Sequence, residues 1–497
     1  MNYLIPLMVI IPIICGLLLN LFSKQNKLIK AIAIVVGIVL PIIPLVCNYG
    51  LHYFGGHVPL INSTITGLPS YISNSVLNIF HPGITYSFGG LEKVFLFALG
   101  IVAFLAIFSY ANSYKKASGP YMFLMFMGTA AVSALMISDD IFNMYVFFEI
   151  AALTQTGIII ASDVKDNYET ALKYMILGSI GGPMLLLGIS FLLGLVGSVN
   201  ITDIVYVVHH GLLASPQSRS ILLFAFGLIF FGVIYASGLP PFNVIKSSVY
   251  SKAEIQGASL LQAFSVVTLI AFIIALFRIF HVFAIFQWLV IIFSVLAMIL
   301  GVSMALIQTD FRRMIGYLAV GELGFVGLGI GLSTQFSITA GLFQGFNEII
   351  ITALLFIGLG TAAYLTNTSD TRKLGGLISI HPKVAIMVLL GGFAMAGVPP
   401  FNGFRSKLMI IQAALSSGYP ELAIIGVLVS IVTFMVFVKA FHSIYLKPKP
   451  KDLQFVNKSI PKSVIFSIGV LLIICLVVGI YPEIVTNVIS QFVGGLF

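Results

Sequence analysis

The sequence predicts an all-α integral membrane protein of about 14 transmembrane helices, and two features of its composition lead to that class. Of its 497 residues, 59% are hydrophobic and only 8% are charged, whereas a soluble domain carries about 25% charged side chains. The apolar residues form helix-length blocks rather than the alternating pattern of membrane β-strands. This composition excludes an ordinary soluble enzyme, a nucleic-acid-binding module and a disordered protein.

Fourteen apolar stretches divide the chain, each at or near the ~20 residues that cross a bilayer. They lie near residues 3–23, 29–50, 92–110, 121–138, 141–162, 170–197, 219–249, 256–280, 284–308, 312–333, 337–364, 383–416, 421–446 and 463–482. The first stretch has no basic leader and no small-residue cleavage site, so we expect a retained span. The seventh and twelfth stretches are too long for one straight span, and each contains a Gly/Pro break.

Topology explains the net charge of +9. Lysine and arginine gather in alternate connections, for example at Arg312 and Arg313 and in the basic loop 447–462. By the positive-inside rule these connections are cytoplasmic. Both termini are then extracytoplasmic, in a multi-pass protein of a prokaryotic plasma membrane. Loop 51–91 lies on the same side; it contains no Lys, Arg, Asp or Glu, and its Gly and Pro residues suggest turns or a small hairpin.

One hexapeptide occurs twice. Residues 238–243 read GLPPFN and residues 397–402 read GVPPFN, and a cation follows each copy at the same offset, Lys246 and Arg405. The copies belong to the seventh and twelfth spans. These spans are five apart, and two spans separated by an odd number cross the membrane in opposite directions. The chain is therefore expected to contain two inverted five-helix repeats, as many secondary transporters do.

This repeat divides the chain into four parts. Residues 1–110 form an N-terminal three-span segment, and residues 121–280 form the first five-helix repeat. Residues 284–446 form the inverted second repeat. Residues 447–497 supply the basic cytoplasmic loop and a C-terminal span.

Paired prolines make each copy of the hexapeptide a predicted helix break. A proline has no N–H to donate, so two in succession leave carbonyl groups of the preceding turn without a partner. In a membrane those groups need protein, side chains or water. The alternative is a packing kink in an inert bundle. The prolines concerned are Pro240, Pro241, Pro399 and Pro400.

Several ionisable side chains are predicted to lie at membrane depth, where a charge costs at least about 2.5 to 3.5 kcal/mol. Because acids and bases are spread over several spans, we expect a proton relay, with structural salt bridges as the alternative for single residues. One member of the set, Lys252, could instead be an end cap. The candidates are Glu149, Lys173, Lys246, Lys252, Glu322, Glu348, Arg405 and Lys407.

Other polar residues have simpler explanations. Asp139 and Asp140 are expected in a solvated turn, and Lys439 is expected to reach the headgroups from its span end. The three cysteines have no metal or redox spacing. The chain contains no phosphate-loop, flavin or nicotinamide fingerprint, so we expect no cofactor, no metal and no catalytic centre of its own.

The sequence resembles a known family, the antiporter-like subunits shared by Mrp cation/proton antiporters, respiratory complex I and energy-converting membrane hydrogenases. The likeness extends over essentially the whole chain. It is strongest in FEI at 148–150, ALKYMILG at 171–178, DFRRMIGY at 310–317, and GVPPFNGF at 397–404 followed by Lys407.

The resemblance implies fourteen spans with inverted repeats, and it implies roles for matching residues only. Glu149 matches the span-five glutamate that modulates the neighbouring lysine. Lys173 matches the span-six lysine, and Lys407 matches the span-twelve lysine or glutamate of the second half-channel.

The departures from the family concern mainly the first half-channel. Ala236 stands where the span-seven lysine is expected, and Val267 stands at the basic position of span eight. Glu348 replaces the span-eleven histidine, and Glu322 occupies the polar position of span ten. Either Lys246 and Lys252, which follow the first break, take over the role of the missing basic residues, or the N-terminal half does not conduct protons. This divergence fits an energy-converting hydrogenase subunit better than a standard complex I subunit.

These observations together predict a membrane subunit that moves protons, either alone or in exchange for Na⁺, inside a multisubunit ion-pumping complex. Its partners would be other membrane subunits and the lipid bilayer, with no nucleic acid. Lys407 is the expected essential carrier. Two alternatives stay open: a structural subunit that has lost conduction, and a stand-alone transporter of another inverted-repeat fold.

Overall fold

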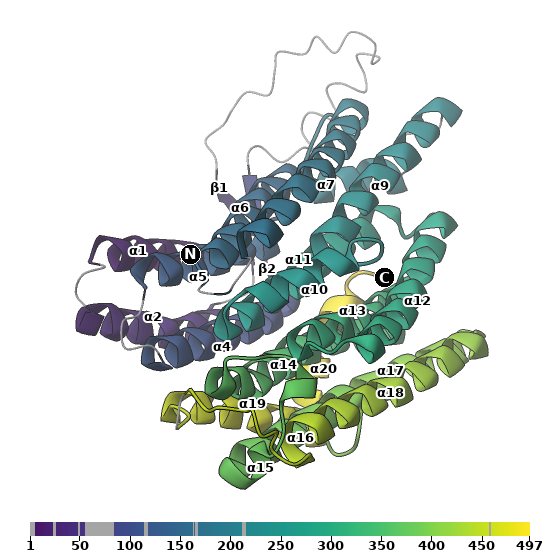
Figure 1. Ribbon diagram of the computed structural model, residues 1–497. Helices are drawn as coiled ribbons and strands as arrows, with labels where there is room; N and C mark the ends of the chain where they lie inside the picture. Colours follow the sequence, from purple (N-terminus) through teal and green to yellow (C-terminus); the bar gives the residue numbers. More distant parts are fainter. Residues whose placement is uncertain are drawn as a thin grey trace.

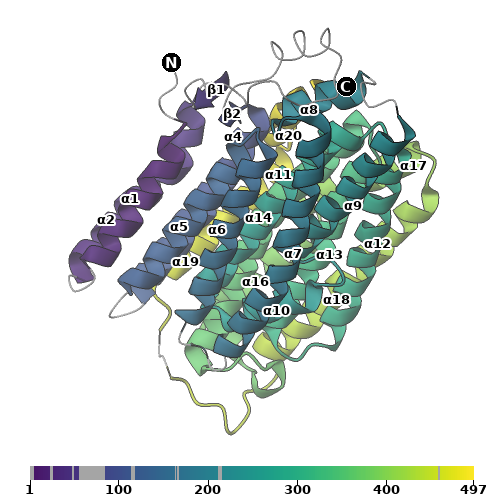
Figure 2. The same ribbon diagram turned by 90° about the horizontal axis from the view of Figure 1, so that it is seen from above.

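The computed structural model describes the chain except for residues 1–4, 23–25, 48–49, 55–83, 114–117, 163, 165–166, 211–214 and 457–458. The described part is a bundle of long helices that run side by side (Figures 1 and 2). Within it, 12 helices are long and apolar enough to cross a membrane, and two shorter apolar helices accompany them. The protein is therefore an all-α, multi-pass membrane protein, as the composition predicts.

The N-terminal part contains three long helices and a pair of strands. The helices are α1 (Leu7–Leu21), α2 (Asn26–Val46) and α4 (Gly90–Ser113). Between α2 and α4, strand β1 (Gly50–Phe54) pairs antiparallel with β2 (Ile84–Phe88). This pairing agrees with the small hairpin expected in loop 51–91, of which residues 55–83 lie outside the described part.

The regular elements that follow are all helices. The middle part consists of α5 (Gly119–Ile137), α6 (Ile141–Ile160), α7 (Asn167–Val196), α8 (Ile201–His209), α9 (Pro216–Ser237), α10 (Asn243–Lys252) and α11 (Ile255–Phe280). The C-terminal part consists of α12 (Ala284–Ile307), α13 (Phe311–Gly331), α14 (Gln335–Thr366), η1 (Thr371–Lys373), α15 (Leu377–Ile380), α16 (Pro382–Ala396), α17 (Asn402–Ser416), α18 (Pro420–Phe441), η2 (His442–Leu446), α19 (Lys462–Ile480) and α20 (Glu483–Gly494).

Three α-helices of the described chain lie outside the fourteen predicted stretches. Helices α8, α15 and α20 have 9, 4 and 12 residues, too few to cross a bilayer, so a search for long apolar blocks passes over them. Helix α20 changes the prediction for residues 447–497, because a further helix follows the C-terminal span.

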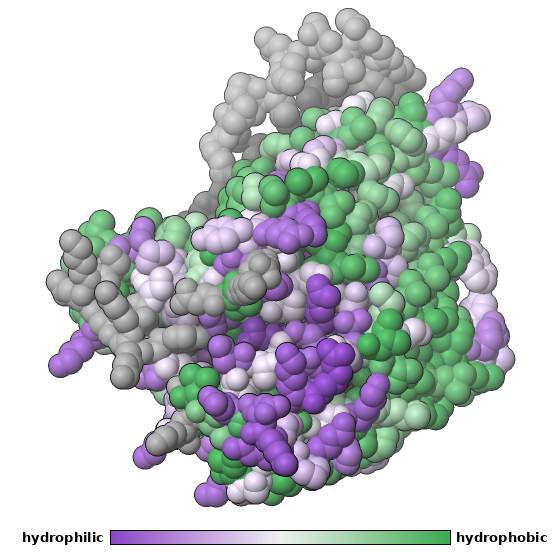
Figure 3. Space-filling view, viewed as in Figure 1, coloured by the Kyte–Doolittle hydropathy of each residue, from purple (hydrophilic) through white to green (hydrophobic). Residues whose placement is uncertain are grey.

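The two ends of the bundle differ. Helices α8 and α20, the β1–β2 pair and the C-terminus lie at one end, and α15 and the connection from η2 to α19 lie at the other (Figure 2). In Figure 3, hydrophilic residues gather over the end that carries α15, whereas hydrophobic residues cover the flank on the right. The assignment of these ends to the two sides of the membrane stays a prediction.

Three helices form the interior of the bundle. The apolar window of α13 is 100% buried, and those of α11 and α14 are each 94% buried, against 33% for α7. Polar side chains on the interior helices are therefore surrounded by protein rather than by lipid. Such side chains are expensive in a membrane and are usually retained for function.

The predicted seventh and twelfth spans are each interrupted. Helix α9 ends before the first proline pair and α10 begins after it, and α16 and α17 flank the second pair in the same way. In both copies the glycine before the break, Gly238 or Gly397, is left-handed, with φ of 73° or 79°. Glycine suits this conformation because a Cβ atom would be strained there.

A second local likeness links the two halves. Asp140 caps α6 by accepting from the backbone N–H of Asn143, and Asp310 caps α13 by accepting from the N–H groups of Arg312 and Arg313. Each capping aspartate also forms an isolated antiparallel bridge, to Asn200 and to Asp370 respectively. These features support a duplication; the opposite orientation of the two copies stays a prediction.

Replacing Asp310 with alanine should destabilise the protein by about 1 to 2 kcal/mol, the usual effect of losing an N-cap. The Asp310 carboxylate lies 2.8 Å and 3.1 Å from two backbone nitrogens of α13, and it also accepts from Ser369. Thermal unfolding in detergent measures the change. Asp452→Ala, in an exposed turn, is the control. Equal unfolding midpoints for the two variants would contradict the capping role.

Candidate functional site

Lys407 lies at the second helix break, buried in the bundle. It belongs to α17, and only 3% of the residue is exposed. Its Nζ donates to Glu322 Oε1 at 2.7 Å and to the main-chain oxygen of Met395 at 2.7 Å. Met395 belongs to the last turn of α16, so the lysine satisfies a carbonyl next to the break. A Cβ on Gly397 would lie 3.2 Å from Lys407 Cδ, because the lysine side chain folds back across this glycine.

Glu322 connects Lys407 to a set of neutral polar side chains. Its second carboxylate oxygen accepts from Gln344 Nε2 of α14 at 2.8 Å. Gln344 Oε1 in turn accepts from the Ser406 hydroxyl of α17 at 2.6 Å. Asn347 then donates to Ser406 at 3.0 Å. Helices α13, α14 and α17 thus hold the ion pair in a network in which each polar group has a partner, as a buried pair requires.

Glu348 is also buried in the bundle, on α14. It is 1% exposed and accepts from Gln262 Nε2 of α11 at 3.2 Å and from the Thr352 hydroxyl. Within the described part of the chain, no Lys, Arg or His forms an ion pair with this carboxyl group. Two neutral donors therefore surround a group that can bind or release a proton.

The first helix break has a similar lysine with different partners. Lys246 of α10 is 2% exposed, and its Nζ donates to Gln155 Oε1 at 3.2 Å and to Ser265 Oγ at 2.8 Å. Tyr174 also donates to Gln155, and its ring centroid lies 5.3 Å from Lys246 Nζ. A Cβ on Gly238 would lie 2.1 Å from Lys246 Cγ. Like Lys407, this lysine folds back across the glycine at its break.

Helix α11 connects the two halves. Ser265, which accepts from Lys246, and Gln262, which donates to Glu348, are three residues apart and therefore share one helix face. The Tyr250 hydroxyl also donates to Ser265, at 3.1 Å. Polar side chains thus follow one another from α6 and α10, through α11 and α14, to α13 and α17. We call this set the polar band: Gln155, Lys246, Ser265, Gln262, Glu348, Gln344, Glu322, Ser406 and Lys407.

Four of the predicted relay residues lie outside the polar band. The Lys173 side chain is 66% exposed and pairs with Glu169 on its own helix. Arg405 is exposed and donates to the main-chain oxygen of Gly479. Lys252 ends α10 and is half-buried, and so is Glu149 on α6. Sequence pattern predicts the depth of these residues, but it does not predict which side of a helix faces the interior.

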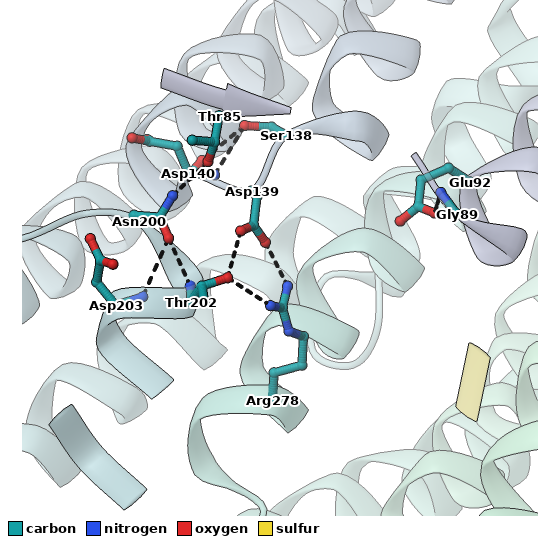
Figure 4. Close-up of polar contacts among 10 residues, drawn as sticks. All are labelled: Thr85, Gly89, Glu92, Ser138, Asp139, Asp140, Asn200, Thr202, Asp203 and Arg278. Atoms are coloured by element: carbon teal, nitrogen blue, oxygen red, sulfur yellow. Dashed lines mark hydrogen bonds and ion pairs between the residues drawn. The ribbon is translucent and has the colours of Figure 1, made fainter. Parts of the chain in front are cut away.

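Asp139 and Asp140 correct the expectation of a solvated turn, because both are buried. Asp139 Oδ1 lies 2.6 Å from Arg278 Nη1, and its other carboxylate oxygen accepts from Thr202 at 2.8 Å (Figure 4). Burial raises the pKa of the Asp140 carboxyl, and the Asn143 N–H opposes that change. The turn is short and charged, as turns in solvent are, but α8 and α11 cover it.

Sequence reasoning missed the neutral members of the polar band. These members carry no charge, although each is a polar residue inside an apolar stretch: Gln155, Gln262, Ser265, Gln344 and Ser406. Amide and hydroxyl side chains at membrane depth were the available signal, because they also need partners there.

Comparison with known proteins now decides the family. The model of the family described as "NADH:quinone oxidoreductase/Mrp antiporter, TM" matches residues 138–433. The chain belongs to this family. The match confirms the resemblance seen in the motifs, and it covers both helix breaks and every residue of the polar band.

Two relatives show how far the likeness to this NADH:quinone oxidoreductase/Mrp antiporter family extends. An uncharacterised protein of Methanocaldococcus jannaschii is 37% identical over 500 residues, which cover 99% of this chain and 98% of the relative. A Na⁺/H⁺ antiporter subunit from Alkalihalophilus pseudofirmus is 26% identical, over 89% of this chain and 86% of the relative.

Two solved structures share the fold of this family member. A chain of the Mrp complex from Dietzia sp. matches with a TM-score of 0.85 at 19% identity, over 100% of this chain and 98% of the other. A chain of the membrane-bound sulfane sulfur reductase, an archaeal respiratory membrane complex, matches with a TM-score of 0.80 at 22% identity, over 99% and 97%. Both likenesses extend over almost the entire chain.

Proposed function

We propose that this protein is a proton-translocating subunit of a multisubunit membrane complex in a prokaryotic plasma membrane, and that protons move along the polar band. The observation that carries the proposal is the buried Lys407–Glu322 pair, which lies beside a helix break and is linked through Gln344 to other polar groups. Similarity to an antiporter subunit and to chains of two membrane complexes supports it. The energy source would be a partner subunit or an ion gradient.

The geometry allows proton transfer without separation of charge. Lys407 Nζ and Glu322 Oε1 are 2.7 Å apart, so a proton that moves from the lysine ammonium to the carboxylate leaves a neutral amine and a neutral carboxylic acid. Because isolated charges are costly at this depth, such neutralisation keeps the intermediate accessible. A change in the charge of either partner changes whether the other holds its proton. The Gln344 amide fixes the orientation of the Glu322 carboxyl group, and the Gln262 amide fixes that of Glu348.

Proton flux in membrane vesicles that contain the intact complex tests the function. A fluorescent pH indicator should report proton movement that requires this subunit, and an imposed Na⁺ gradient should drive it if Na⁺ is exchanged. Full ion transport by a complex whose subunit carries Lys407→Ala would overturn the proposal in favour of a structural subunit. A solitary purified protein that binds an organic solute would favour the stand-alone transporter.

Ala236 stands at the position where the family resemblance implies a span-seven lysine. We further propose that Lys246 takes the role of that lysine. Lys246 folds back across Gly238, and Ala236 is buried on the other side of the break. Lys246→Ala should lower proton transport about tenfold, below the range of about 10² to 10⁴ for an essential transfer group, because the second half retains its own pair. The double variant Ala236→Lys/Lys246→Ala should recover part of the loss.

Lys252→Ala is the matched control, since Lys252 lies on the same helix but outside the polar band. Proton flux in vesicles measures all three variants. Equal rates for Lys246→Ala and the wild-type protein would show that the N-terminal half does not conduct.

A further inference from the structure

A large cavity lies at the end of the bundle that carries the C-terminus. Its volume is about 770 Å³, and it is lined by residues of the β2–α4 turn, the α5–α6 turn, α8, α11 and α20. This end is opposite to the one that carries α15 (Figure 2). The polar band does not include any residue of its lining, so the cavity is a separate feature.

An ion pair forms one wall of this cavity. Arg278 of α11 donates to Asp139 at 2.6 Å and to the Thr202 hydroxyl at 3.2 Å, and Thr202 donates to the second oxygen of Asp139 (Figure 4). The Asp139 main-chain N–H also donates to the main-chain oxygen of Thr85. These contacts join the α5–α6 turn, α8 and α11, and they use both Asp139 oxygens. The pair therefore serves as a fixed, neutral part of the lining.

Glu92 is a different kind of lining residue. It lies in the first turn of α4, is 7% exposed, and accepts the N–H of Gly89 at 2.7 Å (Figure 4). No described Lys, Arg or His forms an ion pair with it. The Arg278 charge in the same lining also acts on Glu92, but Arg278 is paired with Asp139. A buried carboxylate with no cation in ion-pair contact needs water or a proton, because the charged form is costly to desolvate. The cavity therefore presents a carboxyl group that can exchange a proton with water.

The cavity extends along α11 toward the polar band. Ala271 and Ala275 of α11 line it. Ser265 of the band lies six residues before Ala271, about 9 Å along the helix at a rise of ~1.5 Å per residue. Thr268 lies between them, three residues from each, so it is the helix-surface neighbour of both Ser265 and Ala271. Water in the cavity would come within two helical turns of the band.

We propose that this cavity is the aqueous vestibule through which protons pass between the polar band and the water at the C-terminal end, and that Glu92 is its proton-binding group. This assignment rests on the proposed function, because it assumes that protons move along the polar band. The ligand chemistry fits a proton better than a metal cation. Asp139 is fully engaged by Arg278 and Thr202, and one Glu92 oxygen already accepts the Gly89 N–H, so few oxygens are free to coordinate a metal ion.

Cysteine labelling tests the vestibule without depending on transport. In the intact complex, the three native cysteines are replaced by serine, and one cysteine is introduced at Ala275 or at Leu276. Both side chains are buried, but Ala275 lines the cavity and its neighbour Leu276 does not. A charged, membrane-impermeant thiol reagent should modify Ala275→Cys at least about tenfold faster than Leu276→Cys, because the thiolate reacts where water reaches it. Equal, slow reaction at both positions would overturn the vestibule.

Proton flux then tests Glu92. Glu92→Gln keeps an oxygen that can accept the Gly89 N–H, so the fold should persist, but it cannot exchange a proton. We expect proton transport to fall about 100-fold, which is within the range for a positioned proton-transfer group. The rate at which the thiol reagent modifies Ala275→Cys should be unchanged by Glu92→Gln. Glu483→Gln, an exposed carboxyl at the same end, is the control and should leave transport unchanged.

The outcomes separate the two proposals. Wild-type transport by Glu92→Gln would overturn the role of Glu92. A wild-type complex that moves no protons would overturn the proposed function, while the labelling of Ala275→Cys would still decide whether water enters the cavity.

Discussion

Lys407→Ala should reduce proton transport at least about 100-fold, the lower end of what a positioned proton-transfer group contributes. Lys407 is the cationic member of the buried pair, and its Nζ contacts both Glu322 and the carbonyl of Met395 at the break. Alanine removes the group that carries the proton and leaves the carboxyl group without its partner. The initial rate of proton movement in vesicles of the intact complex measures the effect.

The control for this variant is Lys439→Ala. Lys439 is exposed at the end of α18, where it donates to the main-chain oxygen of Leu306. Its loss should leave transport within about twofold of the wild-type rate, since exposed polar contacts contribute little. Near-normal transport by Lys407→Ala, with normal assembly of the complex, would mean that the subunit has a structural role.

Glu322→Leu alone should destabilise the protein by about 3 to 5 kcal/mol, because it leaves the buried Lys407 without its carboxylate. The two side chains are 4% and 3% exposed, so water cannot replace the missing partner. In the double variant Glu322→Leu/Lys407→Met, both charges are absent and apolar side chains fill similar volumes. Most of the lost stability should therefore return. Thermal unfolding of the detergent-solubilised protein measures both variants.

The double variant Glu322→Leu/Lys407→Met should recover stability but not proton transport. The double variant lacks both proton-binding groups, so its proton flux should stay as low as that of Lys407→Ala. This pairing separates folding from function, because the same protein is then stable and inactive. Recovery of transport in the double variant would show that protons follow a route that avoids the pair.

Local properties of the chain were enough to predict its class and its two interruptions. Hydropathy is a sum over neighbouring residues, so the apolar helices could be found without knowledge of their packing. Proline and glycine act on their own turn of helix, and α9 and α16 both end at the glycine that precedes a proline pair. The motifs around Glu149 and Lys407 also sufficed to indicate the family that the comparisons then showed.

Other features depended on which helices pack together. Lys173 and Lys407 are both lysines of predicted spans, yet one is mostly exposed and the other is buried beside a glutamate 85 residues away in the chain. The sequence around Asp139 predicts a solvated turn, but Thr202 of α8 and Arg278 of α11 contact its carboxylate in the folded protein. Sequence periodicity cannot resolve such cases in a chain that is apolar on nearly every face, because the usual polar stripe of an amphipathic helix is missing.

The sequence by itself determined the membrane class and the helix breaks, since each follows from residues close together in the chain. Only the tertiary structure decided that Lys246 and Lys407 fold back across their glycines, that neutral amides donate to Glu348 and Glu322, and that a cavity reaches α11. A hydrogen bond between helices requires two side chains to meet in space. That meeting is set by the packing of the whole bundle rather than by any one segment.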